Sequence, residues 1–343
     1  MKALMYMGPR ELILTDIPEP SPAPNEIKIK VKLVGICGSD VHGYTGATGR
    51  RIPPMVMGHE MSGVVSECGS GATKFQVGDR VVVQPVQYCG ECKYCKENSI
   101  NICANRKGLG VMDINGGFTE YVCMNEKFAY KLADSVSDES AALMDPVSVA
   151  YHAVKKILPL EGKNIMISGA GTIGLLVLKV AKLYNPQNIA ILDMSDDRLW
   201  LAKEYGATVT INPAQQDIKE ELEKAGIFGE INCTIECVGA TPTAQQTINY
   251  VQNQGTVLWV GNAAKMININ MQEIVTRELS VFGCYAFTED DFAEVLELLE
   301  KNKLNVTEII SGIIPLHQAP DAFESLAASA GKDIKIIVDM DAD

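Results

Sequence analysis

The chain has 343 residues, which is more than one hydrophobic core usually supports, so we expect two domains. Hydrophobic residues make up 47% of the chain and charged residues 21%, as in globular proteins that fold in water. The net charge of −13 argues against nucleic acid and anionic membranes as partners, because both bind basic surfaces. The first residues lack the apolar run of a signal peptide or membrane span, so we expect a cytoplasmic protein with no membrane partner.

The first part of the chain is expected to be rich in β-strands. Between residues 26 and 36, apolar side chains alternate with lysines, and this period of two predicts a half-buried antiparallel strand. Glycine and proline separate the apolar segments that follow, which is typical of many short strands. These further segments are GVVSEC (63–68), DRVVVQP (79–85) and GGFTEYVCM (116–124).

Two short segments of this part contain side chains that bind metals or move protons. The segments GICGSDVH and GHE supply Cys37, Ser39, Asp40, His42, His59 and Glu60. Cys37 and His59 together would offer catalytic zinc a mixed sulfur and nitrogen site with one position left free. Taken alone, each has a simpler interpretation: a structural histidine at 59, turn residues at 39 and 40, and a surface histidine at 42.

A loop further along carries four cysteines. Cys89, Cys92, Cys95 and Cys103 follow the pattern C-x2-C-x2-C-x7-C. In a long chain without an export signal, clustered cysteines are better explained as metal ligands than as disulfides. Four thiolates on one short loop match the closed tetrahedral coordination of structural zinc. We therefore expect this site to hold the loop together and to do no chemistry.

The pattern changes near Pro146, where apolar strands and helical segments begin to alternate. This alternation predicts a parallel sheet with helices on both faces. The predicted strands are NIMIS (164–168), NIAILD (188–193), ATVTI (207–211), EINCTIE (230–236) and GTVLWVG (255–261). A helix near 289–301, a second helix and a final strand, DIKIIVD, are expected to return to the first domain. The predicted domains are 1–150 with 286–343, and 151–285.

A glycine-rich turn in the second domain predicts a dinucleotide site. The residues of this GxGxxG pattern, which joins a strand to a helix, are Gly169, Gly171, Thr172, Ile173 and Gly174. The first glycine permits the turn, the second lets a pyrophosphate approach, and the third lets helix and strand pack closely.

Two further residues bear on the choice of cofactor. Asp193 ends the next predicted strand, nineteen residues after Gly174, where a carboxylate would accept hydrogen bonds from a ribose diol. It would repel a 2′-phosphate, so NAD is predicted over NADP. The simpler interpretation of Asp193 is a helix cap. Arg198 is either a solvated helix residue or a contact of the adenosine ribose.

At this point the motifs resemble a known family. The pattern GHE-x2-G-x5-G-x2-A, from Gly58 to Ala72, resembles the zinc signature of the medium-chain alcohol dehydrogenase superfamily. The CGSDVH segment, the four-cysteine loop, the GxGxxG turn and the late return strand occur in that family's order. The segment MDPVSVAYHA makes the chain similar to sorbitol, butanediol, threonine and galactitol-phosphate dehydrogenases, because polyol enzymes usually place Glu-Pro where this chain has Asp145 and Pro146.

The resemblance implies roles for five residues. Cys37 and His59 would bind the catalytic zinc. Glu60 would be either a third ligand or a group just outside the ligand sphere. Asp145, one methylene shorter than the usual glutamate, would bind the metal directly or through its water. Asp40 would orient His59, as ligating histidines generally require.

The resemblance also implies a fold and a reaction. The fold would be α/β, a doubly wound Rossmann sheet that binds NAD plus a β-rich, GroES-like catalytic zinc domain. Zinc would act as a Lewis acid on a secondary alcohol of a polyol, vicinal diol or polyol phosphate, and a hydride would pass to NAD. Ser39 would accept the proton and pass it through the cofactor ribose to His42. Family members are homodimers or homotetramers. The alternative is an inactive zinc- and NAD-binding sensor or structural protein.

The identity of the alcohol depends on weaker signals. Arg50 and Arg51, adjacent in the loop between the two ligand segments, would clamp a phosphorylated polyol or simply be solvated. Tyr44, Met112 and Phe118 fit the wall of a substrate pocket and fit a hydrophobic core equally well.

Overall fold

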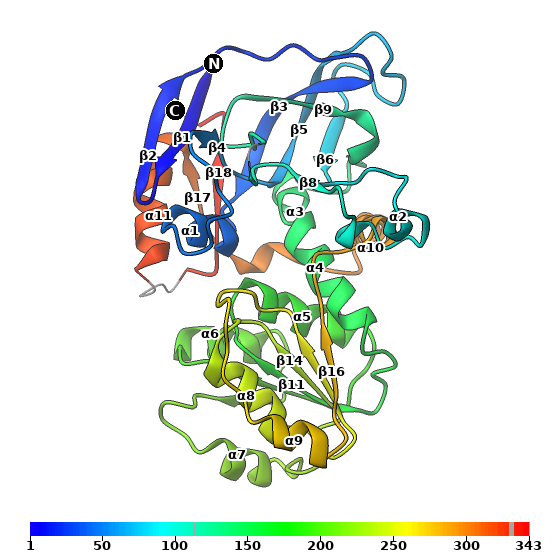
Figure 1. Cartoon of the computed structure of the whole chain (residues 1–343), viewed down its shortest axis with the longest axis vertical. Coiled ribbons are helices and arrows are strands. Elements are labelled where there is room, and N and C mark those ends of the chain that lie inside the picture. Colours follow the sequence, from blue (N-terminus) through cyan, green and yellow to red (C-terminus); the bar gives the residue numbers. More distant parts are fainter. Residues whose placement is uncertain (113, 329–332, 343) are drawn as a thin grey trace. The chain divides into compact units, whose positions relative to one another are not determined.

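The computed structural model describes residues 1–112, 114–328 and 333–342. The chain divides into two compact units (Figure 1). The first, here called the β-rich unit, comprises Met1–Asp145 and Phe287–Asp343. The second, the α/β unit, comprises Pro146–Ala286. In the described ranges, no helix is long and apolar enough to cross a membrane.

The β-rich unit is organised around one long strand, β3 (Glu26–Gly35). Ile27, Ile29 and Val31 are fully buried and alternate with partly exposed lysines, so the predicted antiparallel strand is confirmed. The sheet has the order β10-β6-β5-β3-β18-β17, and β9 also pairs with β3. The other strands of this sheet are β5 (Glu60–Cys68), β6 (Arg80–Val83), β9 (Tyr121–Asn125), β10 (Ala129–Lys131), β17 (Ile310–Pro315) and β18 (Lys335–Asp339).

The last strand returns to the start of the chain. β18 pairs antiparallel with β3, with Ile337 opposite Gly35, and parallel with β17 (Figure 1). Residues more than 290 positions apart in the sequence therefore lie side by side in the β-rich unit, as for the pair Lys335 and Ile36.

Smaller elements complete the β-rich unit. A three-stranded sheet contains β1 (Lys2–Gly8), β2 (Glu11–Asp16) and β4 (Met55–Val56), and a short pair contains β7 (Val86–Gln87) and β8 (Lys107–Gly108). The helices are α1 (Gly38–Tyr44), α2 (Lys93–Lys96), α3 (Asp138–Ala142), α10 (Glu289–Glu300) and α11 (Ala319–Ala327). Helix α4 (Met144–Lys155) begins in this unit and continues into the next.

The α/β unit contains a six-stranded parallel sheet of order β13-β12-β11-β14-β15-β16. The strands are β11 (Asn164–Ser168), β12 (Asn188–Leu192), β13 (Val209–Ile211), β14 (Cys233–Glu236), β15 (Thr256–Trp259) and β16 (Ser280–Gly283). The helices are α5 (Thr172–Lys182), α6 (Asp196–Glu204), α7 (Ile218–Lys224), α8 (Thr241–Tyr250) and α9 (Met271–Thr276).

This strand order identifies a doubly wound fold. The order reverses beside β11, and ligands of such sheets bind outside the carboxyl ends of the strands at that reversal. All five residues of β11 are buried, as expected of a parallel strand covered on both faces. The predicted combination of a Rossmann sheet with a β-rich domain is confirmed.

Candidate active site

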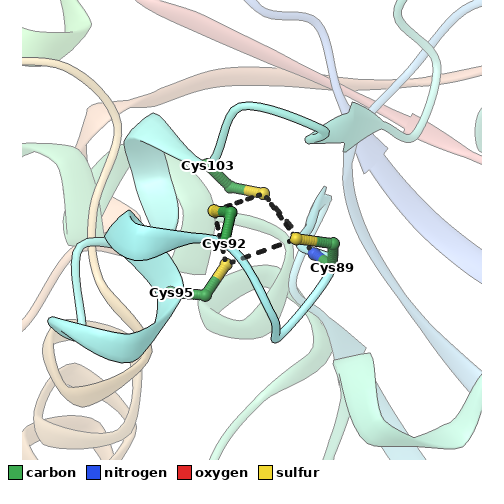
Figure 2. A group of neighbouring side chains, drawn as sticks. All are labelled: Cys89, Cys92, Cys95 and Cys103. Atoms are coloured by element: carbon green, nitrogen blue, oxygen red, sulfur yellow. Dashed lines mark hydrogen bonds between the residues drawn. The ribbon is translucent and has the colours of Figure 1, made fainter.

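The four-cysteine loop lies between β7 and β8 and brings its sulfurs together (Figure 2). Zinc binds thiolates at about 2.3 Å, so the sulfurs of a tetrahedral site lie about 3.8 Å apart. The observed Sγ–Sγ distances are 3.5 Å for Cys89–Cys103 and Cys92–Cys95, 3.8 Å for Cys92–Cys103, and 3.9 Å for Cys89–Cys95. The four side chains therefore fit a closed tetrahedral zinc site.

The backbone of this loop prepares two of the cysteines for a metal. Hydrogen bonds from the backbone N–H groups of Glu91 and Cys92 lower the pKa of Cys89 to about 6. The backbone N–H groups of Cys95 and Ala104 likewise lower the pKa of Cys92. Burial raises the pKa of Cys95 to about 12. Four adjacent thiolates would repel one another, so the loop needs a cation to hold all four deprotonated.

The second cluster is assembled by the pairing of two strands. Cys37 follows the end of β3 and Glu60 begins β5, and the antiparallel register places Gly35 opposite Glu60. One ligand atom from each of Cys37, His59 and Glu60 lies within 4.8 Å of the others. The structure thus brings together three of the four residues to which the resemblance gave a role at catalytic zinc.

Asp40 lies behind the histidine of this cluster. Its Oδ1 is 3.4 Å from Nδ1 of His59, which leaves the other ring nitrogen available for a metal. Burial would raise the pKa of Asp40, but the charges of His59 and Arg51 outweigh it and hold that pKa well below its usual range. Burial would lower the pKa of His59, but Asp40 and Cys37 raise it well above its usual value.

A buried ion pair holds Glu60, and its cation was missed by the sequence analysis. Lys335 Nζ donates to Glu60 Oε2 at 2.7 Å and to the carbonyl oxygen of Ile36 at 2.9 Å, and both side chains of the pair are 1% exposed. Burial opposes the charge on Lys335, but Glu60 raises its pKa above the usual value. A Cβ at Gly35 would lie 2.2 Å from Glu60 Oε2, so the glycine leaves room for the carboxylate.

Asp145 occupies the start of α4, next to this cluster but outside its compact donor set. Burial raises the pKa of Asp145 to about 7, and the neighbouring charge of Glu60 adds to the effect, while His59 and Lys335 act against it. A carboxylate with this pKa exchanges its proton near neutrality, and a nearby cation would keep it ionised.

Ser39 and His42 lie on α1, and both are exposed. The backbone N–H of Ser39 donates to Cys37 Sγ at 3.4 Å, so the hydroxyl group follows the candidate ligand on the same turn. The turn therefore presents a hydroxyl and an imidazole to solvent beside the cluster.

Neither interpretation of Arg50 and Arg51, a phosphate clamp or a solvated loop pair, is correct for Arg51. Arg50 is exposed, whereas Arg51 is buried and its Nη2 contacts Asp40 Oδ1 at 2.5 Å and Ser39 Oγ at 3.2 Å. The loop turns the second arginine inward because a buried carboxylate attracts it.

The proposed pocket residues divide between core and surface. Tyr44 and Phe118 both pack against Phe323, with ring centroids 5.6 Å and 5.7 Å apart. These two aromatic residues belong to the core, and Met112 is exposed.

In the α/β unit, the glycine-rich turn has the geometry that the motif predicts. Gly169 has a φ of +101°, which favours glycine. A Cβ at Gly174 would lie 1.8 Å from the carbonyl oxygen of Gly169, so a side chain there would collide with the turn. Space is open beside Gly171, where a Cβ would meet nothing within 4 Å. Thr172 and Ile173 form the first turn of α5.

Asp193 is fixed beside this turn by two backbone groups. Its Oδ2 accepts from the N–H of Ala170 at 2.7 Å and its Oδ1 from the N–H of Ser195 at 2.9 Å. Each oxygen keeps a lone pair for another donor. Arg198 lies on α6, its backbone N–H 3.4 Å from Ser195 Oγ.

Glu236, another group missed by the sequence analysis, organises the loop after β14. Its carboxylate accepts from the N–H of Val238 at 2.9 Å, from that of Gly239 at 2.7 Å, and from Thr243 Oγ1 at 2.5 Å. A Cβ at Gly261 would lie 2.3 Å from Glu236 Oε2. The signal in the sequence that could have revealed Glu236 was an acidic residue at the end of an apolar strand.

A doubly wound unit and a β-rich unit with two metal-ligand clusters together define the class of the zinc-containing dehydrogenases. Residues 23–134 match the alcohol dehydrogenase GroES-like domain, and residues 172–301 match the zinc-binding dehydrogenase model. The chain belongs to this zinc-binding alcohol dehydrogenase family, as the sequence resemblance predicted.

Individual relatives refine the comparison. The chain is 34% identical to a sorbitol dehydrogenase of Halalkalibacterium halodurans, over 98% of this chain and 99% of the relative. It is 34% identical to D-xylulose reductase A of Aspergillus niger, over 92% of this chain and 89% of the relative. Two solved structures, each 30% identical and 99% covered on both sides, are also similar. One is the Escherichia coli CFT073 alcohol dehydrogenase rspB in complex with NADH (TM-score 0.92), and the other is 2R,3R-butanediol dehydrogenase from Bacillus subtilis (TM-score 0.89).

Proposed function

We propose that the protein is an NAD-dependent zinc dehydrogenase that oxidises a secondary alcohol of a polyol or vicinal diol. The observation that carries this proposal is the donor set of Cys37, His59 and Glu60, whose ligand atoms lie within 4.8 Å of one another. A sulfur, a nitrogen and an oxygen donor, with Asp40 behind the histidine, suit a catalytic zinc that keeps a position for substrate.

Each residue of this site would have its own role in the reaction. Cys37 and His59 would hold the metal, Glu60 would be shared between the metal and Lys335, and Asp145 would reach the metal or its water. When bound, zinc acts as a Lewis acid that makes an alcohol hydroxyl more acidic, and NAD accepts the hydride.

Two residues on α1 would then move the proton. The Ser39 hydroxyl can accept a proton while it donates its own, and His42 is exposed to water, to which its imidazole can pass the proton. The four-cysteine loop would hold a second, structural zinc.

The choice of NAD rests on Asp193. Its fixed carboxylate suits a ribose diol, and the open space at Gly171 suits the pyrophosphate. The similar rspB structure was solved with NADH, and a Sinorhizobium meliloti zinc-binding dehydrogenase, 28% identical, was solved with NADP. Asp193 in this chain favours NADH over NADPH.

The polyol class is supported by the names of the relatives and by the burial of Arg51. The sorbitol dehydrogenase, xylulose reductase and butanediol dehydrogenase named above all have a polyol, its ketose or a diol in their names. Because Arg51 is buried against Asp40, an uncharged alcohol is favoured over a phosphorylated one.

A substrate screen tests the proposal. Purified protein with zinc and NAD is offered polyols, vicinal diols, simple secondary alcohols and polyol phosphates, and NADH absorbance is followed. We expect turnover with an uncharged polyol or diol, abolished in Cys37→Ser and kept in Cys68→Ser, a cysteine outside both clusters. Binding of zinc and NADH without turnover on any alcohol would instead support the sensor or structural role.

The oligomeric state belongs to the same proposal. From the family resemblance we infer a homodimer or homotetramer. Light scattering coupled to size-exclusion chromatography measures the mass directly, and a mass near the 37.2 kDa of one chain would contradict the inference.

A further inference from the structure

Arg51 is a buried cation in direct contact with Asp40 and Ser39, the two side chains next to the proposed catalytic cluster. Its side chain is 2% exposed and that of Asp40 is 0% exposed, so the pair is removed from solvent. The Nη2 atom lies 2.5 Å from Asp40 Oδ1 and 3.2 Å from Ser39 Oγ, so one nitrogen connects both side chains.

The chain is shaped to place this guanidinium. A Cβ at Gly43 would lie 2.4 Å from Cγ of Arg51, so the glycine on α1 leaves room for the arginine stem. The backbone on either side is held by Met112, whose N–H donates to the carbonyl oxygen of Arg50 and whose carbonyl oxygen accepts from Ile52. Arg51 is therefore built into the site and does not fold in from a free loop.

The chemistry of the guanidinium fixes the direction of one hydrogen bond. Arginine has donors and no acceptor, so Ser39 Oγ must accept from Arg51. The Ser39 O–H is then directed elsewhere, and one lone pair of Oγ stays free to receive a proton. Without this donor, the Ser39 hydroxyl can rotate and donate its hydrogen to a neighbouring carboxylate. In that orientation it cannot pass its proton along the proposed path.

We propose that Arg51 is a positioning residue for proton transfer, which holds the Ser39 hydroxyl in the orientation that accepts the alcohol proton. This proposal rests on the function proposed above. Asp40 contributes by keeping the guanidinium in place, since its Oδ1 accepts from the same nitrogen that holds Ser39. In the loop sequence GRRIPP, Arg50 is exposed and Arg51 is buried, so only Arg51 can act on Ser39.

The test compares Arg51→Met and Arg51→Lys with Arg50→Met, a matched control on the exposed neighbour. Removing a well-placed proton-transfer group typically costs 10²–10⁴-fold, and misorienting it costs part of that. We expect kcat to fall about tenfold or more in Arg51→Met, less in Arg51→Lys, and by less than about twofold in the control, with KM for the alcohol nearly constant. Zinc content, measured independently of turnover, should stay at the wild-type value in all three.

A double-variant comparison separates positioning from general support of the fold. In a Ser39→Ala background there is no hydroxyl to orient, so the Arg51 substitutions should lower kcat by no more than about twofold further. An equal loss in both backgrounds, or a loss of zinc that parallels the loss of kcat, would overturn the proposal. If Arg51→Met does not fold, Arg51→Lys, which keeps a cation for Asp40, carries the same comparison.

A crystallographic readout distinguishes failure of this proposal from failure of the proposed function. We expect the Ser39 side chain to change rotamer in the Arg51 variants and to remain in place in Arg50→Met. An unchanged Ser39 rotamer in the Arg51 variants would refute the positioning role whatever the activity. A wild-type protein that oxidises no alcohol would refute the proposed function, and the rotamer comparison would still decide what Arg51 does.

Discussion

Two carboxylates of the β-rich unit are buried together with cations, Glu60 with Lys335 and Asp40 with Arg51. Burying charges costs several kcal/mol for each ion, and the attraction within a pair offsets that cost only while both members are present. The stability contributed by each residue therefore depends on its partner, and single substitutions should have larger effects than paired ones.

Lys335→Met should lower the free energy of unfolding by about 3–5 kcal/mol, because it leaves the Glu60 carboxylate buried without its cation. The double variant Lys335→Met/Glu60→Gln should recover much of this loss. Lys30→Met, at a lysine that is 43% exposed and pairs with Asp341, is the matched control and should cost at most about 1 kcal/mol. Urea unfolding followed by fluorescence measures all three. A loss in Lys335→Met no larger than in the control would show that the pair is dispensable.

A buried tyrosine makes stability depend on alkaline pH. Burial, together with a hydrogen bond to Glu324 at 2.8 Å, raises the pKa of Tyr44 to about 12. The unfolded chain ionises this tyrosine near pH 10, so the folded state holds the proton more tightly between pH 10 and pH 12. The contribution of the Tyr44 proton to the free energy of unfolding is present in full below about pH 10 and is lost as the pH rises through about 12.

We therefore expect the free energy of unfolding of the wild type to fall more steeply above pH 10 than that of Tyr44→Phe, by about 3 kcal/mol in total. Tyr94→Phe, at an exposed tyrosine of the four-cysteine loop, serves as the control and should keep the wild-type slope. Parallel pH profiles for the wild type and Tyr44→Phe would show that the tyrosine proton is bound equally in both states.

At the scale of elements, the four-cysteine loop is hydrogen-bonded to a helix about two hundred residues away in the sequence. Tyr88 Oη donates to Glu289 Oε2 at 2.5 Å, and Asn98 Nδ2 donates to Asp290 Oδ2 at 2.6 Å. Both acids lie in the first turn of α10, which a capping box between Thr288 and Asp291 also holds. Metal in the loop should therefore stabilise the start of α10 as well.

Two zinc ions per chain are expected, and each cluster should lose its own ion. Cys103→Ser should release the structural zinc, and Cys37→Ser should release the other, so metal analysis falls from about two to about one in each variant. Amide exchange should then rise in α2 and at the start of α10 in Cys103→Ser, whereas Cys37→Ser should leave these segments protected. Protection unchanged in Cys103→Ser, despite the lost zinc, would separate the loop from the helix energetically.

The elements themselves were largely predictable because they follow local periodicity. The alternation in β3, the strand and helix series after Pro146, and the glycine-rich turn each depend on neighbours within a few residues. The metal clusters were found because their cysteines and histidine fall in short motifs. Lys335 was missed because its role depends on the pairing of β18 with β3, although a lysine in the apolar strand DIKIIVD was a visible signal.

The burial of Arg51 was not predicted, for a related reason. Two adjacent arginines in a loop look equivalent in the sequence, and the difference between them depends on the space at Gly43 and on the backbone contacts of Met112. Neither can be read from local pattern. Buried charges held by tertiary contacts are therefore the part of this site that required coordinates.

At the scale of the whole molecule, the cofactor should link binding to stability. A ligand that binds only the folded state stabilises it by RT ln(1 + [L]/Kd), which is about 2.7 kcal/mol when its concentration is one hundred times Kd. The strand order of the α/β unit favours a dinucleotide, and the fixed Asp193 favours NAD over NADP. NADH should therefore raise the Tm of this protein, and NADPH at the same concentration should not.

Asp193→Asn should relax this preference. The amide keeps one oxygen for the backbone N–H of Ala170 or Ser195 but removes the charge that would repel a 2′-phosphate. Asp197→Asn, at an exposed acid in the first turn of α6, removes the same charge nearby and is the matched control. We expect the Tm gain from NADPH to approach that from NADH in Asp193→Asn alone, with kcat/KM for the two cofactors changing in parallel. An equal Tm gain of the wild type from NADH and NADPH would mean that Asp193 does not discriminate between the two riboses. An equal loss of cofactor preference in Asp193→Asn and Asp197→Asn would assign the preference to the net charge around α6.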